Sequence, residues 1–128
     1  MAREAQIIAW DDAARDVDDK WVRAFEQAEL VRAGYARRLG CDAREVALAA
    51  STHELVVRLL SALPLAEKPR LVTTDGEFHT LRRQLDRLNE AHIVEVVKLA
   101  ADPVDTLAER LVASVDDRTS AVLVSSVL

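Results

Sequence analysis

The stretch RLVTTDGE, residues Arg70–Glu77, decides the fold class of this 128-residue chain. Its first five residues are mostly apolar or β-branched, which favours a β-strand, and the letters DGE predict a turn where that strand ends. Leu81, Leu85 and Leu88 then recur at spacings of three and four, which predicts a helix with one apolar face. A strand that turns directly into a helix is the repeating unit of a layered α/β fold.

The alternation of strands and helices continues on both sides of this stretch. A helix is predicted over Val17–Leu39, where apolar residues recur at helical spacing and Gly40 supplies the C-terminal cap. The other predicted elements are a strand at Glu45–Ala50, a helix from Ser51 to Pro64, a strand at Ile93–Leu99, a helix from about Pro103 to Val115, and a last strand at Ala121–Leu128 that is apolar enough to be covered on both faces. This order predicts an α/β fold with three α/β/α layers and a mostly parallel sheet.

Composition narrows the classes of partner. The formal net charge of −5 argues against a general nucleic-acid partner, because binding phosphates needs a surplus of lysine and arginine. No apolar run approaches the roughly 20 residues that cross a bilayer, so no membrane partner is expected. Cys41 is the single cysteine, which excludes an internal disulfide and fits a reducing cytoplasm. Three glycines are too few for a glycine-rich phosphate loop, and the histidines lack a metal-binding spacing.

Three loops are candidate ligand sites, because ligands of such sheets bind at the carboxyl ends of the strands. The first is Ser51-Thr52-His53, at the start of a predicted helix. Its hydroxyls and the exposed N–H groups of the helix favour an anion. The same residues also suit simple helix capping, with Ser51 or Thr52 as the cap and Glu54 near the third position.

The second and third loops have two interpretations each. Phe78 follows the predicted strand at residues 70–74, next to His79 and Thr80, and its ring either stacks on a flat ligand or packs in the core under the helix. Ser125 and Ser126 follow an apolar run, so their hydroxyls either face a ligand or satisfy backbone groups at the strand end.

Taken together, three segments resemble the pyridoxal-phosphate enzymes of the class V aminotransferase and kynureninase family, which have fold type I. The segments are ARRLGCDAREVALAASTHELVVRLLSAL, RLVTTDGEFHTLRRQLDRL and VASVDDRTSAVLVSSVL, and the resemblance covers about Trp21 to Leu128. It corresponds to the N-terminal part of the family's large domain. It implies pyridoxal 5′-phosphate as cofactor, an amino acid as substrate and a homodimer. The implied reaction is aminotransfer, desulfuration or kynureninase-type hydrolysis.

The resemblance also assigns roles to individual residues. Ser51 and Thr52 match the turn that holds the cofactor phosphate, and Phe78 matches the aromatic residue that stacks on the pyridine ring. His79 and Thr80 fall in the same cofactor-contacting turn. Kynureninases usually have proline where His79 stands, and this departure leaves the substrate open between kynurenine and another amino acid. Ser125 matches a hydroxyl residue beside the cofactor.

The resemblance places two catalytic groups of the family beyond Leu128: the lysine that forms the Schiff base and the aspartate that pairs with the pyridine nitrogen. Lys98 matches neither of these groups. We therefore expect residues 17–128 to be a partial large domain that follows an N-terminal segment, residues 1–16, and we expect the fragment itself to be inactive. The alternative is a stand-alone small α/β binding or interaction domain without catalysis.

Overall fold

The computed structural model describes residues 1–125 and divides into two compact units, which we treat separately. The first unit is Met1–Ala49 and the second begins at Ala50. The sequence suggested a division after residue 16. That division stays a prediction; across this point, Arg23 Nη1 lies 2.9 Å from Asp16 Oδ2 and 3.5 Å from Asp12 Oδ1.

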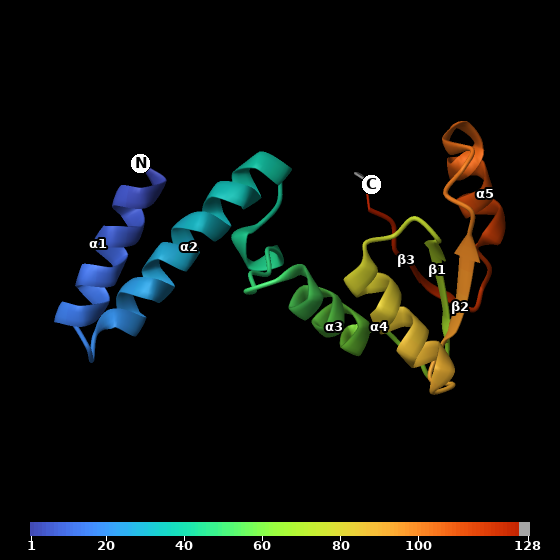
Figure 1. Ribbon diagram of the computed structural model, residues 1–128, viewed down its shortest axis with the longest axis horizontal. Helices are drawn as coiled ribbons and strands as arrows, with labels where there is room; N and C mark the ends of the chain where they lie inside the picture. Colours follow the sequence, from blue (N-terminus) through green and yellow to red (C-terminus); the bar gives the residue numbers. More distant parts are fainter. Residues whose placement is uncertain (126–128) are drawn as a thin grey trace. The chain divides into compact units, whose positions relative to one another are not determined.

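The first unit consists of helices (Figure 1). Helix α1 spans Ala2–Arg15, α2 spans Lys20–Leu39, and a short 3-10 helix, η1, spans Ala43–Glu45. Gly40 ends α2 in the left-handed region with φ of 72°, as its place in the sequence predicts. Most apolar side chains of α1 and α2 are exposed, and Ala36 is the buried residue of α2.

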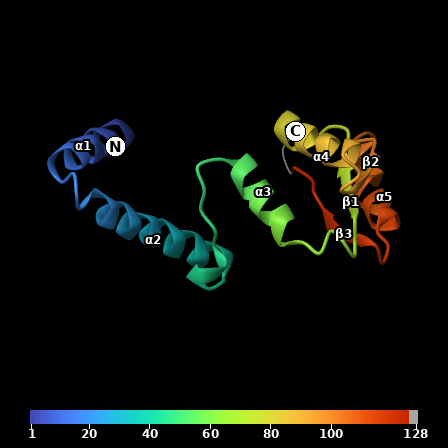
Figure 2. The ribbon, with the colours of Figure 1, turned by 90° about the horizontal axis from the view of Figure 1, so that it is seen from below.

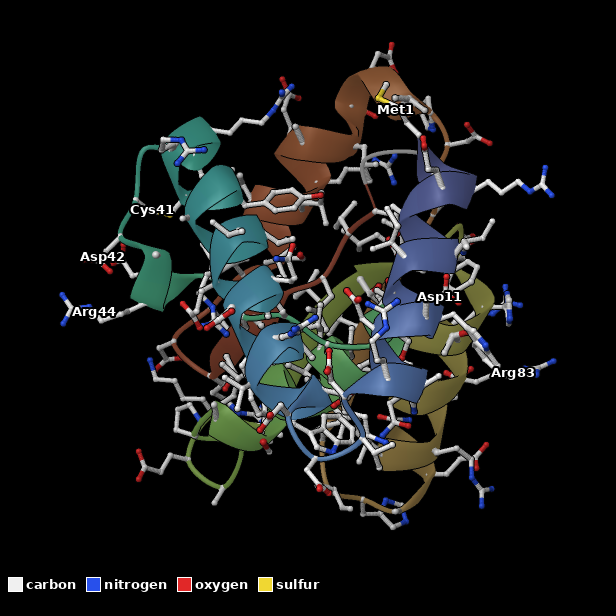
Figure 3. All side chains as sticks on the ribbon, turned by 90° about the vertical axis from the view of Figure 1, so that its left-hand side faces the viewer. Met1, Asp11, Cys41, Asp42, Arg44 and Arg83 are labelled. Atoms are coloured by element: carbon white, nitrogen blue, oxygen red, sulfur yellow. The ribbon has the colours of Figure 1, made fainter. Side chains whose placement is uncertain are left out.

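The predicted strand at Glu45–Ala50 is wrong. Glu45 instead ends η1, where the Asp42 carboxylate accepts from the Arg44 N–H and the Glu45 carboxylate accepts from the Asp42 N–H, and residues 46–49 belong to neither a helix nor a strand. This reciprocal capping favours a helical turn at residues 43–45, and the apolar residues that follow it do not join the sheet, which consists of β2, β1 and β3. The side chains of Asp42 and Arg44 also pair on the surface of this unit, close to the exposed Cys41 (Figure 3).

The second unit is an α/β structure built on a parallel three-stranded sheet. The strand order is β2-β1-β3, so β1 is central, and residue pairs such as Leu71 with Val96 and Leu71 with Ala121 set the register. Its elements are α3 (Thr52–Ala62), β1 (Arg70–Thr74), α4 (His79–Glu90), β2 (Glu95–Leu99), η2 (Val104–Thr106), α5 (Leu107–Ser114) and β3 (Thr119–Val122). The α/β class with a parallel sheet is therefore confirmed.

The helices of this unit lie on both faces of the sheet. From β1 the chain passes through α4 to β2, and from β2 it passes back through α5 to β3, on the other side of β1. Right-handed crossovers that run in opposite directions place their helices on opposite faces. Figures 1 and 2 show α4 and α5 on opposite sides of the strands, with α3 next to α4.

The core lies between the sheet and the α3–α4 layer. Leu60 of α3, Leu71 of β1 and Leu85 of α4 are buried against one another, together with Val94. The strand covered on both faces is β1, whose residues Leu71–Thr74 are all fully buried.

The last predicted strand is shorter and more exposed than expected. Within residues 1–125, β3 pairs with β1 on one side, and it is half-buried or exposed along its length. We expected this last strand to be covered on both faces, but the strand that is covered in this way is β1. The last three residues of the predicted strand, 126–128, lie outside the described residues.

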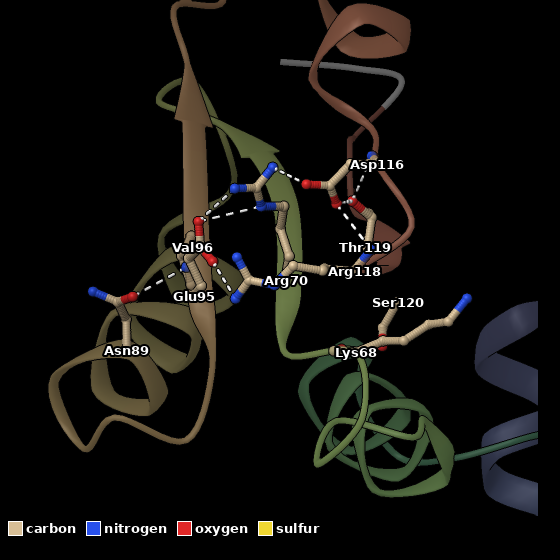
Figure 4. A network of polar contacts seen from close by, with 9 residues as sticks. All are labelled: Lys68, Arg70, Asn89, Glu95, Val96, Asp116, Arg118, Thr119 and Ser120. Carbon is tan, nitrogen blue, oxygen red and sulfur yellow. Dashed lines mark hydrogen bonds and ion pairs between the residues drawn. The ribbon is translucent and has the colours of Figure 1, made fainter.

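A polar network fixes the amino ends of the three strands (Figure 4). Arg70 Nη2 lies 2.7 Å from Glu95 Oε1, and Arg118 Nη2 lies 2.9 Å from Glu95 Oε2. Hydrogen bonds from Arg70 hold the pKa of Glu95 below its ordinary value. Burial raises the pKa of Asp116, but the Thr119 hydroxyl and other donors outweigh it, so that pKa is also lowered. No helix within residues 1–125 is long and apolar enough to cross a membrane.

Candidate functional site

The carboxyl edge of the sheet contains a point where the strand order reverses. The chain moves outward from β1 to β2 and then returns to place β3 on the other side of β1. Open α/β sheets bind ligands in the crevice that such a reversal creates outside the strand ends. Here the crevice is bordered by Asp75–Phe78, which follow β1, and by Leu123–Ser125, which follow β3.

Glu77 joins these two segments. Its side chain is buried, with 4% of its surface exposed. One carboxylate oxygen accepts from the Ser125 N–H, and the other accepts from the Ser125 hydroxyl at 2.7 Å. The Phe78 N–H also donates to this carboxylate, at 3.3 Å. Three donors thus surround a buried negative charge, which is what a charge in this position requires.

Two further hydrogen bonds hold the segment after β3 against β1. The Leu123 N–H donates to the Val72 carbonyl at 2.8 Å, and the Thr73 hydroxyl donates to the Leu123 carbonyl at 2.9 Å. The backbone therefore continues beside β1 past the assigned end of β3. This pairing positions Ser125 at the carboxyl edge.

Helix α3 contributes its N-terminus to the same edge. Ser51 is the N-cap, and its hydroxyl accepts from the Glu54 N–H at 3.2 Å. Glu54 in turn accepts from the Ala50 N–H at 3.3 Å. Thr52 is the first helical residue rather than the cap, so its hydroxyl is not needed to close the helix. The N–H groups of Thr52 and His53 belong to the first turn, where a helix offers them no internal acceptor.

These segments enclose a small pocket, which we call the carboxyl-edge pocket. Its volume is about 50 Å³. It is lined by Thr52, His53 and Val56 of α3, by Phe78, Thr80 and Leu81 at the start of α4, and by Ser125. Four of the six residues predicted from the sequence, namely Thr52, Phe78, Thr80 and Ser125, therefore meet at one place.

The other two predicted residues lie beside this pocket. Ser51 serves as the cap of α3, which is the structural role anticipated for that turn. His79 does not line the pocket, but its ring centroid lies 4.3 Å from that of Phe78 at an interplanar angle of 55°. Phe78 is 54% exposed, so it is not the core residue that one interpretation predicted. Part of its side chain is therefore accessible to a ligand.

The pocket suits one end of pyridoxal 5′-phosphate better than the whole molecule. Sites that enclose a complete small-molecule ligand have volumes of roughly 300 Å³ or more. At about 50 Å³, the carboxyl-edge pocket has room for an anion the size of a phosphate. The helix N-terminus and the Thr52 and Thr80 hydroxyls are suitable donors for such a group. The Ser125 hydroxyl donates to Glu77, so it is left to act as an acceptor.

Sequence reasoning missed Glu77, the residue that organises this edge. An acidic residue in a polar turn ordinarily suggests a solvated side chain, and nothing in the sequence pairs it with a serine 48 positions away. Asp75 also shapes the turn, since its carboxylate accepts from the Ala101 N–H at 2.8 Å. Among residues 1–125, no group of three or more histidine, cysteine or acidic side chains is placed to hold a metal ion.

Comparison of the chain with models of known protein families, with curated proteins and with solved structures gives no match.

Proposed function

We propose that this chain is part of a pyridoxal-phosphate enzyme acting on an amino acid, of the class V aminotransferase or kynureninase type. The carboxyl-edge pocket would hold the phosphate end of the cofactor. The observation that most supports this proposal is the meeting of Thr52, Phe78, Thr80 and Ser125 around one pocket. These residues come from three distant segments, and the sequence resemblance assigns all four to the cofactor.

Each residue has a role that its chemistry allows. The N–H groups of Thr52 and His53 and the Thr52 hydroxyl hold the phosphate at the N-terminus of α3. Phe78 stacks on the ring from the exposed side, and Glu77 keeps Ser125 in place. When bound, the cofactor supplies an electron sink for reactions at the carbons of an amino acid. We also propose a cytoplasmic location, which the single exposed Cys41 supports.

The test compares two ligands that differ in the phosphate alone. Pyridoxine 5′-phosphate and pyridoxine both lack the aldehyde, so neither reacts with lysine side chains. Calorimetric titration of the 128-residue chain should show that the phosphate compound binds about tenfold more tightly, which corresponds to the upper range of a helix N-terminus acting on an anion. Thr52→Val should weaken binding of the phosphate compound, because it removes a hydroxyl donor at that end.

Ser61→Ala is the matched control, because Ser61 lies at the other end of α3 and donates to the Arg58 carbonyl. It should leave the affinity unchanged. Equal binding of both compounds, or binding of neither, would contradict the proposal. That result would favour the alternative of a small α/β binding or interaction domain without catalysis.

A further inference from the structure

A cleft of about 330 Å³ lies between the two long helices of the first unit. Its walls include Ala9, Asp12 and Ala13 of α1 and Lys20, Trp21 and Ala24 of α2. None of its lining residues belongs to the carboxyl-edge pocket. Sites for small molecules begin at volumes of roughly 300 Å³, so the cleft is large enough for such a ligand.

Small side chains on both helices leave this space open. Ala9 and Ala13 are four residues apart, so they share one face of α1, and Ala24 belongs to the α2 wall. Eight residues line the cleft in all. A stable protein–protein interface needs roughly 20–30 residues on each side, so the cleft suits a small molecule better than a protein partner.

The charges that line the cleft leave one positive charge unbalanced. Asp12 is paired with Arg23, whose Nη1 lies 3.5 Å from Asp12 Oδ1 and 2.9 Å from Asp16 Oδ2. Lys20 is half-buried, and it forms no ion pair with another residue in the described part of the chain, residues 1–125. A half-buried ammonium without an acidic partner favours a ligand that carries one negative charge.

Trp21 supplies a flat apolar surface beside this ammonium. Its side chain is 64% exposed, and Lys20 Nζ lies 5.9 Å from the centroid of its ring. An aromatic ring that packs against Trp21 therefore brings a carboxylate attached to that ring within reach of Lys20. Gln27, which also lines the cleft, adds amide N–H groups that can donate to the carboxylate.

We propose that the cleft between α1 and α2 binds a flat aromatic carboxylate. The rings lie against Trp21 between the alanines of the two walls, and the carboxylate pairs with Lys20. This arrangement provides an acceptor for the unpaired ammonium and covers the exposed face of the indole. It gives the first unit a binding function that does not depend on the proposed cofactor site.

Three probes separate the two features of the ligand. 2-Naphthoate is flat and negatively charged, 2-naphthamide is flat and neutral, and cyclohexanecarboxylate is charged but not flat. Nuclear magnetic resonance follows the indole N–H signal of Trp21 in the 128-residue chain, and the Trp10→Phe variant assigns that signal. 2-Naphthoate should bind about tenfold more tightly than either of the other probes, because each of them loses one of the two interactions.

Two pairs of variants test the residues. Lys20→Gln should lower the affinity for 2-naphthoate to that for 2-naphthamide, whereas Arg37→Gln, which removes a cation from the last turn of the same helix, should change neither. Ala13→Leu fills the cleft and should abolish binding of 2-naphthoate. Ala14→Leu is its matched control, because Ala14 does not line the cleft. Both alanines are exposed, so neither leucine displaces a packed neighbour, and circular dichroism checks that helicity is kept.

Several results would overturn the proposal. Equal affinities for 2-naphthoate and 2-naphthamide would remove the role of Lys20, and unchanged binding in Ala13→Leu would place the ligand elsewhere. A Trp21 signal that stays fixed up to the solubility limit of 2-naphthoate would show that the cleft does not bind it. A Trp21 signal that moves with protein concentration in the absence of ligand would show that a second chain occupies the cleft instead.

Discussion

Replacing Glu77 should loosen the carboxyl edge of the sheet by an amount that the structure allows us to work out. The Glu77 carboxylate accepts from the Ser125 N–H, the Ser125 hydroxyl and the Phe78 N–H. Hydrogen bonds to a charged group contribute about 1.5–3 kcal/mol each where water is excluded. The Phe78 contact is long, at 3.3 Å, and Ser125 is only half-buried, so water replaces part of what is lost. We therefore expect Glu77→Ala to lower the free energy of unfolding by about 2–4 kcal/mol.

Two further variants divide this loss between its sources. Glu77→Gln keeps one acceptor oxygen and should cost about 1–2 kcal/mol. Ser125→Ala removes only the hydroxyl contact and should cost about 1 kcal/mol. In the double variant Glu77→Ala/Ser125→Ala, that contact is lost only once, so the combined loss should fall short of the sum by about 1 kcal/mol.

The assay is urea unfolding followed by far-UV circular dichroism, with hydrogen exchange at the Ser125 amide as a local measurement. Exchange at this amide should accelerate in Glu77→Ala, because its acceptor is gone. Losses that add within about 0.5 kcal/mol would show that the two side chains are independent. Together with an unchanged Ser125 amide, that result would refute Glu77 as the residue that organises this edge.

Three other outcomes follow from the fold. Because the pKa of Glu95 is lowered in the folded chain, its contribution to stability is complete above its unfolded pKa of about 4.3 and is lost as the pH falls through the folded value. In acid titrations, Glu95→Gln should therefore lose less stability below about pH 4 than the unchanged chain does. An equally steep loss in the variant would contradict this. Ser51→Ala should cost about 0.5–2 kcal/mol, since it removes the cap of α3, whereas Thr52→Ala should cost clearly less; equal thermal melting of the two variants would argue against Ser51 as the cap. Leu85→Ala should lower the free energy of unfolding by about 2–5 kcal/mol, because Leu85 is fully buried. Leu59 is half-exposed, so Leu59→Ala should cost much less, and urea unfolding of the two variants measures this difference.

The alternation of elements after Ser51 was predictable because each segment carries a local signal. The β-branched residues of β1 and the leucines of α4 define a strand and a helix without reference to the rest of the chain. The strand expected at Glu45–Ala50 failed because an apolar run says nothing about a pairing partner, and residues 46–49 do not join the sheet of β2, β1 and β3. Local capping decided only the helical turn that precedes this run, at residues 43–45.

The candidate site was predictable in its position but not in its organisation. The carboxyl-end rule brings the loops at Thr52, Phe78 and Ser125 to one edge once the sheet is known to be parallel. The contact between Glu77 and Ser125 depends on the order of the strands, because β3 must return beside β1 for these residues to meet. Strand order is a property of the whole fold, which local patterns do not carry.

The most direct test of the proposed cofactor site is a map of backbone amide shifts by nuclear magnetic resonance while pyridoxine 5′-phosphate is added. If the carboxyl-edge pocket holds the cofactor phosphate, the amides of Thr52, His53, Phe78 and Ser125 should shift together along one binding curve. Pyridoxine without the phosphate should shift Phe78 more than the two amides of α3. Shifts confined to other parts of the chain, or none at saturating ligand, would contradict a cofactor site at the carboxyl edge.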